Sequence, residues 1–241
     1  MAPLLVLWDI DHTLIDGGDV GRAAYAAAFL EATGLILQRP WRFDGRTELA
    51  AATDALRAHG LDPAGGLLDA FLDALVARFG DRAADLAAAG HVLPGAAAAL
   101  TALRALPEVH QSVLTGNLYS LAVLKMTAFG LAEYIDFRIG GYGSDAYERS
   151  DLPQHAFIRT ERHLGRRHSG ADTVIIGDTL RDVATAKAVG ARIVAVATGS
   201  VAVAELTAAG ADVVLPDLAD TATVVDAVTS TFRAPRECRN A

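Results

Sequence analysis

The chain has 241 residues, of which 52% are hydrophobic and 21% charged, an ordinary balance for a globular protein that buries a sizeable core. Its formal net charge of −8 argues against a nucleic-acid partner, because phosphate backbones are bound by clustered Lys and Arg. The single cysteine, Cys238, excludes an internal disulfide and favours a reducing, cytoplasmic location. No apolar run approaches the roughly 18 residues of a membrane span, and Asp9 cuts the first run too short for a signal peptide, so we expect no membrane partner.

The first predicted element is a strand over residues 4–8, where five apolar residues follow one another. An unbroken apolar run of this length is typical of a strand buried on both faces of a parallel sheet. Asp9 and Asp11 follow at its carboxyl end, where open α/β sheets bind their ligands. Burying two acids there is costly unless a cation or a reaction uses them. We therefore take this strand end as the start of a candidate active site.

The next part of the chain, residues 20–89, is rich in Ala, Leu and Arg and contains no β-branched run. Its apolar residues recur at helical spacing in three segments, 23–30, 49–56 and 67–79. This pattern predicts an all-helical insert made of several short helices. We place the insert at residues 16–93, between two parts of an α/β domain, 1–15 and 94–241.

The remainder of the chain alternates between predicted strands and helices. Further strands are predicted at 111–115, 137–139, 173–178, 192–196 and, as a short extra strand, 212–215. Helices are predicted at 96–106, 118–129, 152–164 and 180–189, with one more before the polar tail. Such alternation implies right-handed crossovers and a mainly parallel sheet. Three strands end in polar groups, so we expect Asp9, Thr115 and Asp178 to surround one crevice.

The two acids after the first strand lie two residues apart, so both carboxylates can face one bound group. Like charges so close together raise one pKa unless a cation intervenes, which would separate Asp9 and Asp11 into an ionised nucleophile and a protonated acid. The alternative is a solvated pair of acids at the start of a loop, or a helix N-cap.

The other two strand ends each allow a functional and a structural interpretation. Thr115, with the N–H groups of Gly116 and Asn117 at a helix start, can hold an anion, or can simply cap the helix. Asp178 and Asp182, together with Asp9, make three carboxylates for one Mg²⁺, which prefers oxygen ligands. The alternative is that Asp178 caps the following helix and Asp182 stabilises its first turn.

These segments, in this order, resemble the motifs of the haloacid dehalogenase superfamily of phosphohydrolases. The first motif matches Asp9–Thr13, the second Leu114–Asn117 and the fourth Gly177–Asp182, and the helical insert occupies the position of the family's cap. The resemblance implies an α/β fold with a Rossmann-like, mainly parallel sheet flanked by helices and an inserted all-helical cap domain. Within the superfamily, residues 43–48 make the chain most similar to the phosphoglycolate-phosphatase-like branch.

The resemblance also implies roles for the acids. Asp9 would attack phosphorus and become an aspartyl-phosphate, and Asp11 would protonate the leaving oxygen and then activate water. Mg²⁺ would be bound by Asp9, the main-chain carbonyl of Asp11 and Asp178. Asp182 would act as a ligand through water or support the other ligands.

The phosphoryl oxygens would be held by the neutral groups around the second motif. By the same resemblance these are the Thr115 hydroxyl and the N–H groups of Ile10 and Gly116, with Asn117 beside them.

The chain departs from the family at the third motif, which commonly carries a Lys followed closely by Pro. No Lys occurs between Lys125 and Lys187, and we expect Arg149 to take the missing role by neutralising the phosphoryl group and pairing with Asp9. Its planar fork is not equivalent to an ammonium group. Lys125 lies in the middle of a predicted helix, and we expect it on a solvated face.

In the insert, Arg46 and Thr47 follow Gly45 in a predicted loop, where they either contact the leaving group or form an ordinary surface turn. His12 is expected to point away from its neighbours, and no pair of histidines has the close spacing of a metal site. The favoured hypothesis is a Mg²⁺-dependent phosphatase acting on a small phosphorylated metabolite. A phosphomutase of the same family and a catalytically silent Mg²⁺-dependent binding module remain alternatives, whereas a dehalogenase would have no use for the extra acids.

Overall fold

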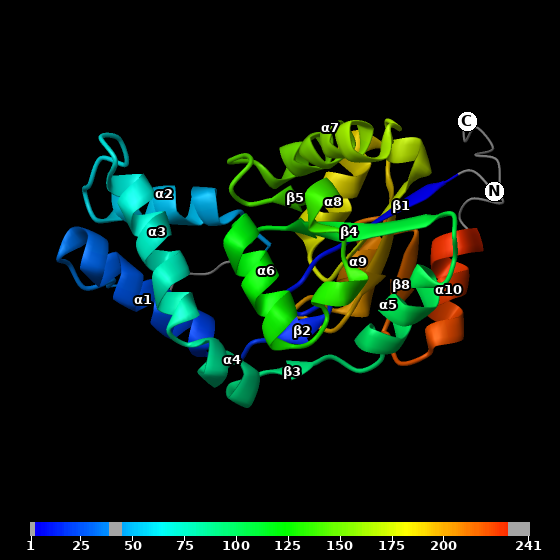
Figure 1. The fold of residues 1–241 in the computed structure, drawn as a ribbon, viewed down its shortest axis with the longest axis horizontal. Helices are drawn as coiled ribbons and strands as arrows, with labels where there is room; N and C mark the ends of the chain where they lie inside the picture. The colour runs from blue at the N-terminus through cyan, green and yellow to red at the C-terminus, as the bar shows by residue number, and fades with distance from the viewer. Residues whose placement is uncertain (1–2, 39–44, 231–241) are drawn as a thin grey trace.

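The computed structural model describes residues 3–38 and 45–230, and its centre is a six-stranded parallel sheet (Figure 1). The strands lie in the order β5-β4-β1-β6-β7-β8 and pair in parallel throughout. Their bounds are Leu4–Trp8 (β1), Val109–Thr115 (β4), Gly141–Tyr142 (β5), Thr173–Gly177 (β6), Arg192–Val196 (β7) and Val213–Leu215 (β8). Strand β1 is central, and all five of its residues are buried, which confirms the first predicted strand.

Helices cover both faces of the sheet, so each strand contributes side chains to two separate cores. Leu4, Val6 and Trp8 of β1 face the core that is closed by α5, α6 and α10, whereas Leu5 and Leu7 face the core closed by α7, α8 and α9. These helices are Ala96–Arg104 (α5), Tyr119–Ala128 (α6), Leu152–Leu164 (α7), Leu180–Val189 (α8), Val203–Ala208 (α9) and Thr221–Ser230 (α10). The fold is therefore the predicted Rossmann-like α/β sandwich.

A group of four helices, α1 to α4, is inserted after the first strand and lies to one side of the sheet (Figure 1). They span Val20–Thr33 (α1), Glu48–Ala58 (α2), Leu67–Gly80 (α3) and Ala83–Ala89 (α4). A third core joins α1, α2 and α3, and in it Phe71 makes edge-to-face contacts with Tyr25 and Phe29. Leu118 and Leu121, beside and on α6, belong to the same core, so this insert packs against α6. We call α1 to α4 the cap.

Two short strands connect the cap to the sheet, and the sequence did not reveal them. Ile15–Asp16 (β2) pairs in antiparallel fashion with His91–Val92 (β3). With two residues each, neither strand shows a readable periodicity, so only the pairing across the chain defines them.

The strand predicted at 137–139 was wrong. These residues form a 3-10 helix, because the Asp136 carboxylate accepts a hydrogen bond from the Arg138 amide at 3.0 Å and bends the chain. The strand that pairs with β4 begins two residues later, at Gly141. Further 3-10 turns cover Ala132–Tyr134, Arg149–Asp151 and Gly170–Asp172. Within the described parts of the chain, no helix is both long and apolar enough to cross a membrane.

Candidate active site

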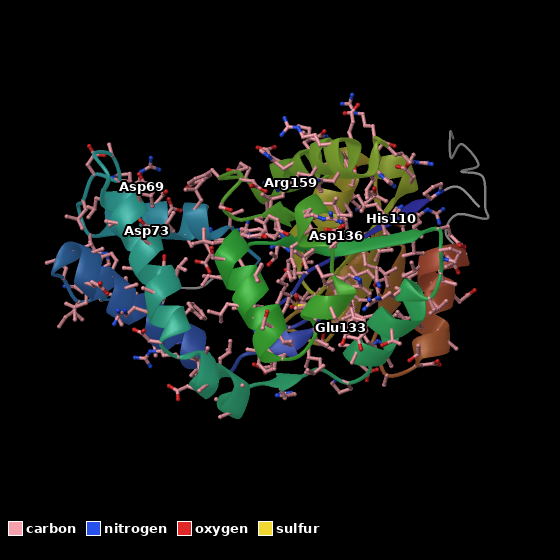
Figure 2. The ribbon with its side chains drawn as sticks, viewed as in Figure 1. Asp69, Asp73, His110, Glu133, Asp136 and Arg159 are labelled. Carbon is pink, nitrogen blue, oxygen red and sulfur yellow. The ribbon has the colours of Figure 1, made fainter. Side chains whose placement is uncertain are left out.

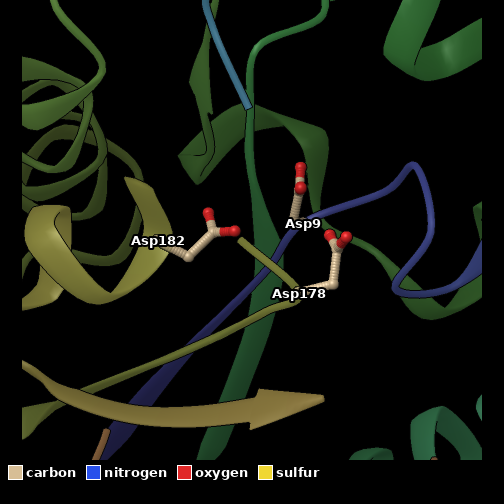
Figure 3. Close-up of side chains that lie close together, drawn as sticks. All are labelled: Asp9, Asp178 and Asp182. Atoms are coloured by element: carbon tan, nitrogen blue, oxygen red, sulfur yellow. The ribbon is translucent and has the colours of Figure 1, made fainter. Parts of the chain in front are cut away.

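Three carboxylates meet at the carboxyl end of the sheet (Figure 3). Asp9 follows β1, Asp178 follows β6, and Asp182 lies in the first turn of α8. One oxygen from each lies within 4.8 Å of the others, and all three side chains are buried. Because β1 and β6 are neighbours in the sheet, Asp9 lies beside Asp178, which follows it by 169 residues in the sequence. Asp9 and Asp178, two of the three residues expected to surround one crevice, therefore lie together.

Asp182 reaches this place because it also caps helix α8. Its Oδ2 accepts hydrogen bonds from the Thr179 amide at 3.0 Å and from the Thr179 hydroxyl at 2.6 Å, and the Thr179 hydroxyl accepts in return from the Asp182 amide. A Cβ on Gly177 would lie 2.4 Å from the Asp182 carboxyl carbon, so only glycine leaves room for this side chain. Helix capping and the acidic cluster thus occur together, and the two interpretations of Asp182 do not exclude each other.

Arg149 supplies the positive charge of the cluster. One of its terminal nitrogens lies 3.2 Å from Asp9 Oδ1 and 2.5 Å from Asp182 Oδ1. The guanidinium also donates to the main-chain carbonyls of Gly45 and Leu114, and only 4% of its side chain is exposed. The pairing of Arg149 with Asp9 that was expected in place of a lysine is therefore present, and it extends to Asp182.

A second cluster surrounds Asp11. Lys125 on α6 donates to both Asp11 oxygens, at 2.8 and 2.7 Å, and to the Asn117 side-chain carbonyl at 2.7 Å. The Asn117 amide donates to Asp11 at 2.8 Å and to the Thr115 hydroxyl at 2.8 Å. Thr115 and Asn117 are buried, whereas the Asp11 side chain is 39% exposed and therefore remains open to the crevice.

The expectation that Lys125 lies on a solvated helix face was wrong. Its side chain is only 9% exposed, because it follows the buried stripe of α6 that includes Leu121, Ala122 and Met126. Leu121 lies four residues before Lys125 and Ala122 three, so the apolar periodicity of the helix already assigned Lys125 to the inner face. A lysine on that stripe was the signal that the sequence interpretation missed.

The electrostatic state of the two clusters differs. Burial raises the pKa of Asp9 to about 6, with the attraction of Arg149 opposing this and the nearby Asp182 and Asp11 adding to it. Burial likewise raises the pKa of Asp178 to about 8, helped by the charges of Asp9 and Asp182. For Asp11, burial also acts to raise the pKa, but the charge and hydrogen bonds of Lys125, with the Asn117 amide, outweigh it and lower the pKa.

The donor set of the acidic cluster fits a divalent cation. Three buried carboxylates face one guanidinium, and burial together with the neighbouring carboxylates raises the pKa values of Asp9 and Asp178. Asp178 receives a neutral hydrogen bond from the Thr13 hydroxyl at 3.3 Å. Asp182, by contrast, already has protein donors on both oxygens. Asp9 and Asp178 are therefore better suited to bind a hard cation directly, and Asp182 to support them.

Stabilisation of the fold by Mg²⁺ is expected to grow as pH rises from about 5 to about 8. Because the folded pKa values of Asp9 and Asp178 lie above the ordinary carboxyl value of 3.8, the metal-free folded state binds more protons than the unfolded state in this interval. The stability linked to these protons is lost as pH rises through the folded pKa values. Mg²⁺ offsets that loss by neutralising the same carboxylates.

The measurement is a set of urea titrations at several pH values, with Mg²⁺ or with EDTA. Asp178→Asn, which removes one of the two raised carboxyl groups, should show a smaller Mg²⁺ effect with a weaker pH dependence. A Mg²⁺ effect that is absent, or that decreases as pH rises, would contradict the assignment of these acids to a metal.

The cap reaches the site through residues 45–49, which we call the cap segment. The amide of Glu48 donates to the Gly116 carbonyl at 2.7 Å, and the amide of Leu49 donates to the Gly143 carbonyl at 3.3 Å. A Cβ on Gly116 would lie 1.9 Å from the main-chain oxygen of Arg46, so glycine permits this close approach. The start of helix α2 is thereby docked directly on the loop that follows β4.

Arg46 and Thr47 lie in this segment as expected, but their polar groups already have partners. The Thr47 hydroxyl accepts from the Ala50 amide as the N-cap of α2 and donates to the Tyr147 carbonyl at 2.7 Å. The Arg46 guanidinium pairs with Asp54. Residues 43 and 44 of the family-like segment lie outside the described residues, and so does Cys238.

His12 adopts a left-handed backbone conformation, with φ of 58°, and forms the turn between β1 and β2. Its amide donates to the Ile15 carbonyl at 2.7 Å. Ile10 is buried, and its amide lies close enough to the Asp9 carboxylate to oppose the rise of that pKa. The Ile10 amide, one of the two main-chain groups expected to hold phosphoryl oxygens, therefore lies beside the nucleophile candidate.

Comparison with protein-family models identifies the family of this chain. A family model described as haloacid dehalogenase-like hydrolase matches residues 4–190, which include β1, β4, β6 and the whole cap. The chain belongs to this hydrolase family. A comparison with curated proteins found no match.

Solved structures resemble the hydrolase over nearly its whole length. A predicted phosphatase from Clostridium acetobutylicum is 20% identical, with a TM-score of 0.68 over 94% of this chain and 100% of the other. A candidate β-phosphoglucomutase from Bacteroides vulgatus is 18% identical, with a TM-score of 0.68 over 97% and 91%. CbbY from Rhodobacter sphaeroides, solved with phosphate, is 19% identical, with a TM-score of 0.69 over 90% and 96%. At this level of identity the likeness concerns the fold.

Proposed function

We propose that the protein is a Mg²⁺-dependent phosphatase that hydrolyses a small organic phosphomonoester through an aspartyl-phosphate on Asp9. The observation that carries the proposal is the position of the Asp9 carboxylate, which faces the guanidinium of Arg149 and the carboxylate of Asp178 at the end of the central strand. A nucleophile there lies between a group that can hold a phosphoryl oxygen and a group that can hold a cation.

The chemistry divides between the two acidic residues of the first motif. A carboxylate oxygen of Asp9 attacks phosphorus, and the bond to the leaving alcohol oxygen breaks as that oxygen takes a proton from Asp11. In the second half, Asp11 removes a proton from water, the water oxygen bonds to phosphorus, and Asp9 is released. Lys125 keeps Asp11 ionised before the substrate binds. Asp11 therefore has to gain the proton that it gives to the leaving oxygen when the substrate binds.

The remaining groups bind and orient the phosphoryl group. Arg149 and the Thr115 hydroxyl, with the amides of Ile10 and Gly116, would hold the phosphoryl oxygens. Arg149 pairs with Asp9, and the Asn117 amide donates to the Thr115 hydroxyl. Mg²⁺ would be held by Asp9, Asp178 and the main-chain carbonyl of Asp11, with Asp182 supporting, and supplies neutralisation of the phosphoryl charge. We also propose that residues 16–93 act as the cap domain of a core formed by 1–15 and 94–241, and that the protein works in the cytoplasm.

A phosphomutase is the second candidate, because one of the structural neighbours carries that name and the reaction uses the same aspartyl-phosphate. The two reactions differ in what receives the phosphoryl group, water or a sugar. A silent binding module is the third candidate, and the presence of Asp9, Asp11 and Asp178 together speaks against it.

The test is phosphate release from nitrophenyl phosphate and from a panel of metabolite phosphates, with Mg²⁺ and with EDTA. We expect free phosphate in the presence of Mg²⁺ and at least a tenfold loss when the cation is removed. An isomeric sugar phosphate in place of free phosphate would assign a mutase. The absence of turnover under both conditions would leave a binding module.

A further inference from the structure

The cap contributes a buried acid, Glu48, that the sequence interpretation did not single out. It is the first residue of α2, and only 7% of it is exposed. Its Oε2 is buried and has no hydrogen-bond partner among the described residues. An acid at a helix start interacts favourably with the helix dipole, so the sequence offered a structural reason for it. The dipole alone does not explain a buried carboxylate oxygen that lacks a donor.

No cation of the described site donates a hydrogen bond to Glu48 Oε2. Lys125 is the nearest, but its three donor positions go to Asp11 Oδ1, Asp11 Oδ2 and the Asn117 carbonyl. The terminal nitrogens of Arg149 are bound to Asp9, Asp182 and two main-chain carbonyls. Arg46 pairs with Asp54. Glu48 Oε2 therefore accepts no hydrogen bond among the described residues, although the Tyr25 hydroxyl, whose pKa is raised by burial, lies close enough for the charge of Glu48 to raise that pKa further.

The position of Glu48 relates it to the leaving group of the substrate. Its amide is bound to the Gly116 carbonyl, which directly precedes Asn117, and the charge of Asp11 acts on its carboxylate. Asp11 is the residue that protonates the leaving oxygen in the proposed reaction, so the leaving alcohol has to lie on the Asp11 side of phosphorus. Glu48, at the docked start of α2, is an acid of the cap within electrostatic range of Asp11.

We propose, on the basis of the proposed function, that Glu48 selects substrates whose leaving alcohol carries a hydrogen-bond donor, a hydroxyl or an ammonium group, and disfavours those that carry a carboxylate. A donor would satisfy the orphaned oxygen, whereas a carboxylate would place a second negative charge beside it in a buried site. The substrate class is therefore a polyol or amino-alcohol phosphate. A phosphorylated hydroxy acid is excluded, even though the cap segment resembles the phosphoglycolate-phosphatase-like branch.

The experiment uses four two-carbon phosphate esters that differ at one position: ethyl phosphate, hydroxyethyl phosphate, aminoethyl phosphate and phosphoglycolate. Each is measured as a competitor of nitrophenyl phosphate hydrolysis, at about pH 8.5, where Glu48 is ionised because burial raises its pKa only to about 7. We expect the hydroxyethyl and aminoethyl esters to compete about tenfold better than ethyl phosphate, and phosphoglycolate about tenfold worse.

Glu48→Gln keeps the shape and removes the charge. It should reduce the ratio of aminoethyl phosphate affinity to phosphoglycolate affinity by about tenfold or more. Glu133→Gln is the matched control, since Glu133 is exposed and lies on the core away from the cap (Figure 2), and it should leave the ratio unchanged. The melting temperatures of both variants show whether Glu48 contributes to stability, and the affinity ratio shows whether it also contributes to substrate selection.

The outcomes separate this inference from the proposed function. If the wild-type protein hydrolyses nitrophenyl phosphate but phosphoglycolate competes as well as the donor-bearing esters, or none competes, the role of Glu48 is overturned and the phosphatase stands. The same holds if Glu48→Gln lowers the melting temperature without changing the ratio. If nitrophenyl phosphate is not hydrolysed at all, the proposed function fails and this inference fails with it.

Discussion

Asp9→Asn is expected to lower the rate of phosphate release by about 10⁴-fold or more, because an amide cannot attack phosphorus or form an acyl phosphate. The fold should survive, since asparagine has the same shape and one buried negative charge is removed from a cluster that contains three. Burial and the neighbouring carboxylates raise the pKa of Asp9, so its ionised form is unfavourable in the metal-free fold, and the variant should be at least as stable as the wild type without metal.

Steady-state phosphate release and thermal unfolding, measured on the same preparation, check both halves of this expectation. Asp73→Asn is the matched control, because Asp73 is exposed on α3 in the cap (Figure 2) and should change neither quantity. Mass spectrometry of acid-quenched wild-type protein should find one phosphoryl group on the peptide that contains Asp9. Turnover by Asp9→Asn at more than about a hundredth of the wild-type rate would assign the nucleophile elsewhere.

Arg149→Met is expected to lower the free energy of unfolding by about 3–5 kcal/mol at neutral pH and to abolish phosphate release. The guanidinium is the one cation paired with both Asp9 and Asp182 in the described structure, and all three side chains are buried. Its removal leaves two buried carboxylates without their counter-charge. The loss should be smaller at low pH, where the carboxylates can bind protons in place of the guanidinium.

Urea titration gives the free energy, and Arg104→Met provides the comparison. Arg104 forms an ion pair with Glu133 at 3.2 Å, but both side chains are more than half exposed, so its loss should cost under about 1 kcal/mol. Arg149→Lys retains a charge without the fork and should fall between the other two variants. If Arg149→Met costs no more than Arg104→Met, the buried pair does not hold the site together.

The sheet and its site were largely predictable, because local patterns and strand order decide them. The run Leu4–Trp8 predicts a central strand, and the carboxyl ends of neighbouring parallel strands have to lie together. The proximity of Asp9 and Asp178 could therefore be predicted without knowledge of any side-chain position. The motif at 177–182 added Asp182, whose capping bond to Thr179 is itself a local interaction.

The errors arose where a residue's environment depends on a distant part of the chain. Lysine is usually solvated, and although helical periodicity places Lys125 on the apolar face of α6, the burial of its ammonium group depends on the cap that packs against α6 and on the acid at position 11. Phe137–Ile139 has the residues of a strand, but the hydrogen bond from Asp136 bends it before pairing can begin.

The amino-acid sequence by itself determined the fold class, which strands end in polar residues, and which acids are available for catalysis, because these depend on periodicity and short-range spacing. The tertiary structure alone decided which charges are paired. Lys125 pairs with Asp11, and Arg149 pairs with Asp9 and Asp182, whereas Glu48 Oε2 has no hydrogen-bond partner among the described residues. Such pairings depend on which side chains the cap and the core present to each other.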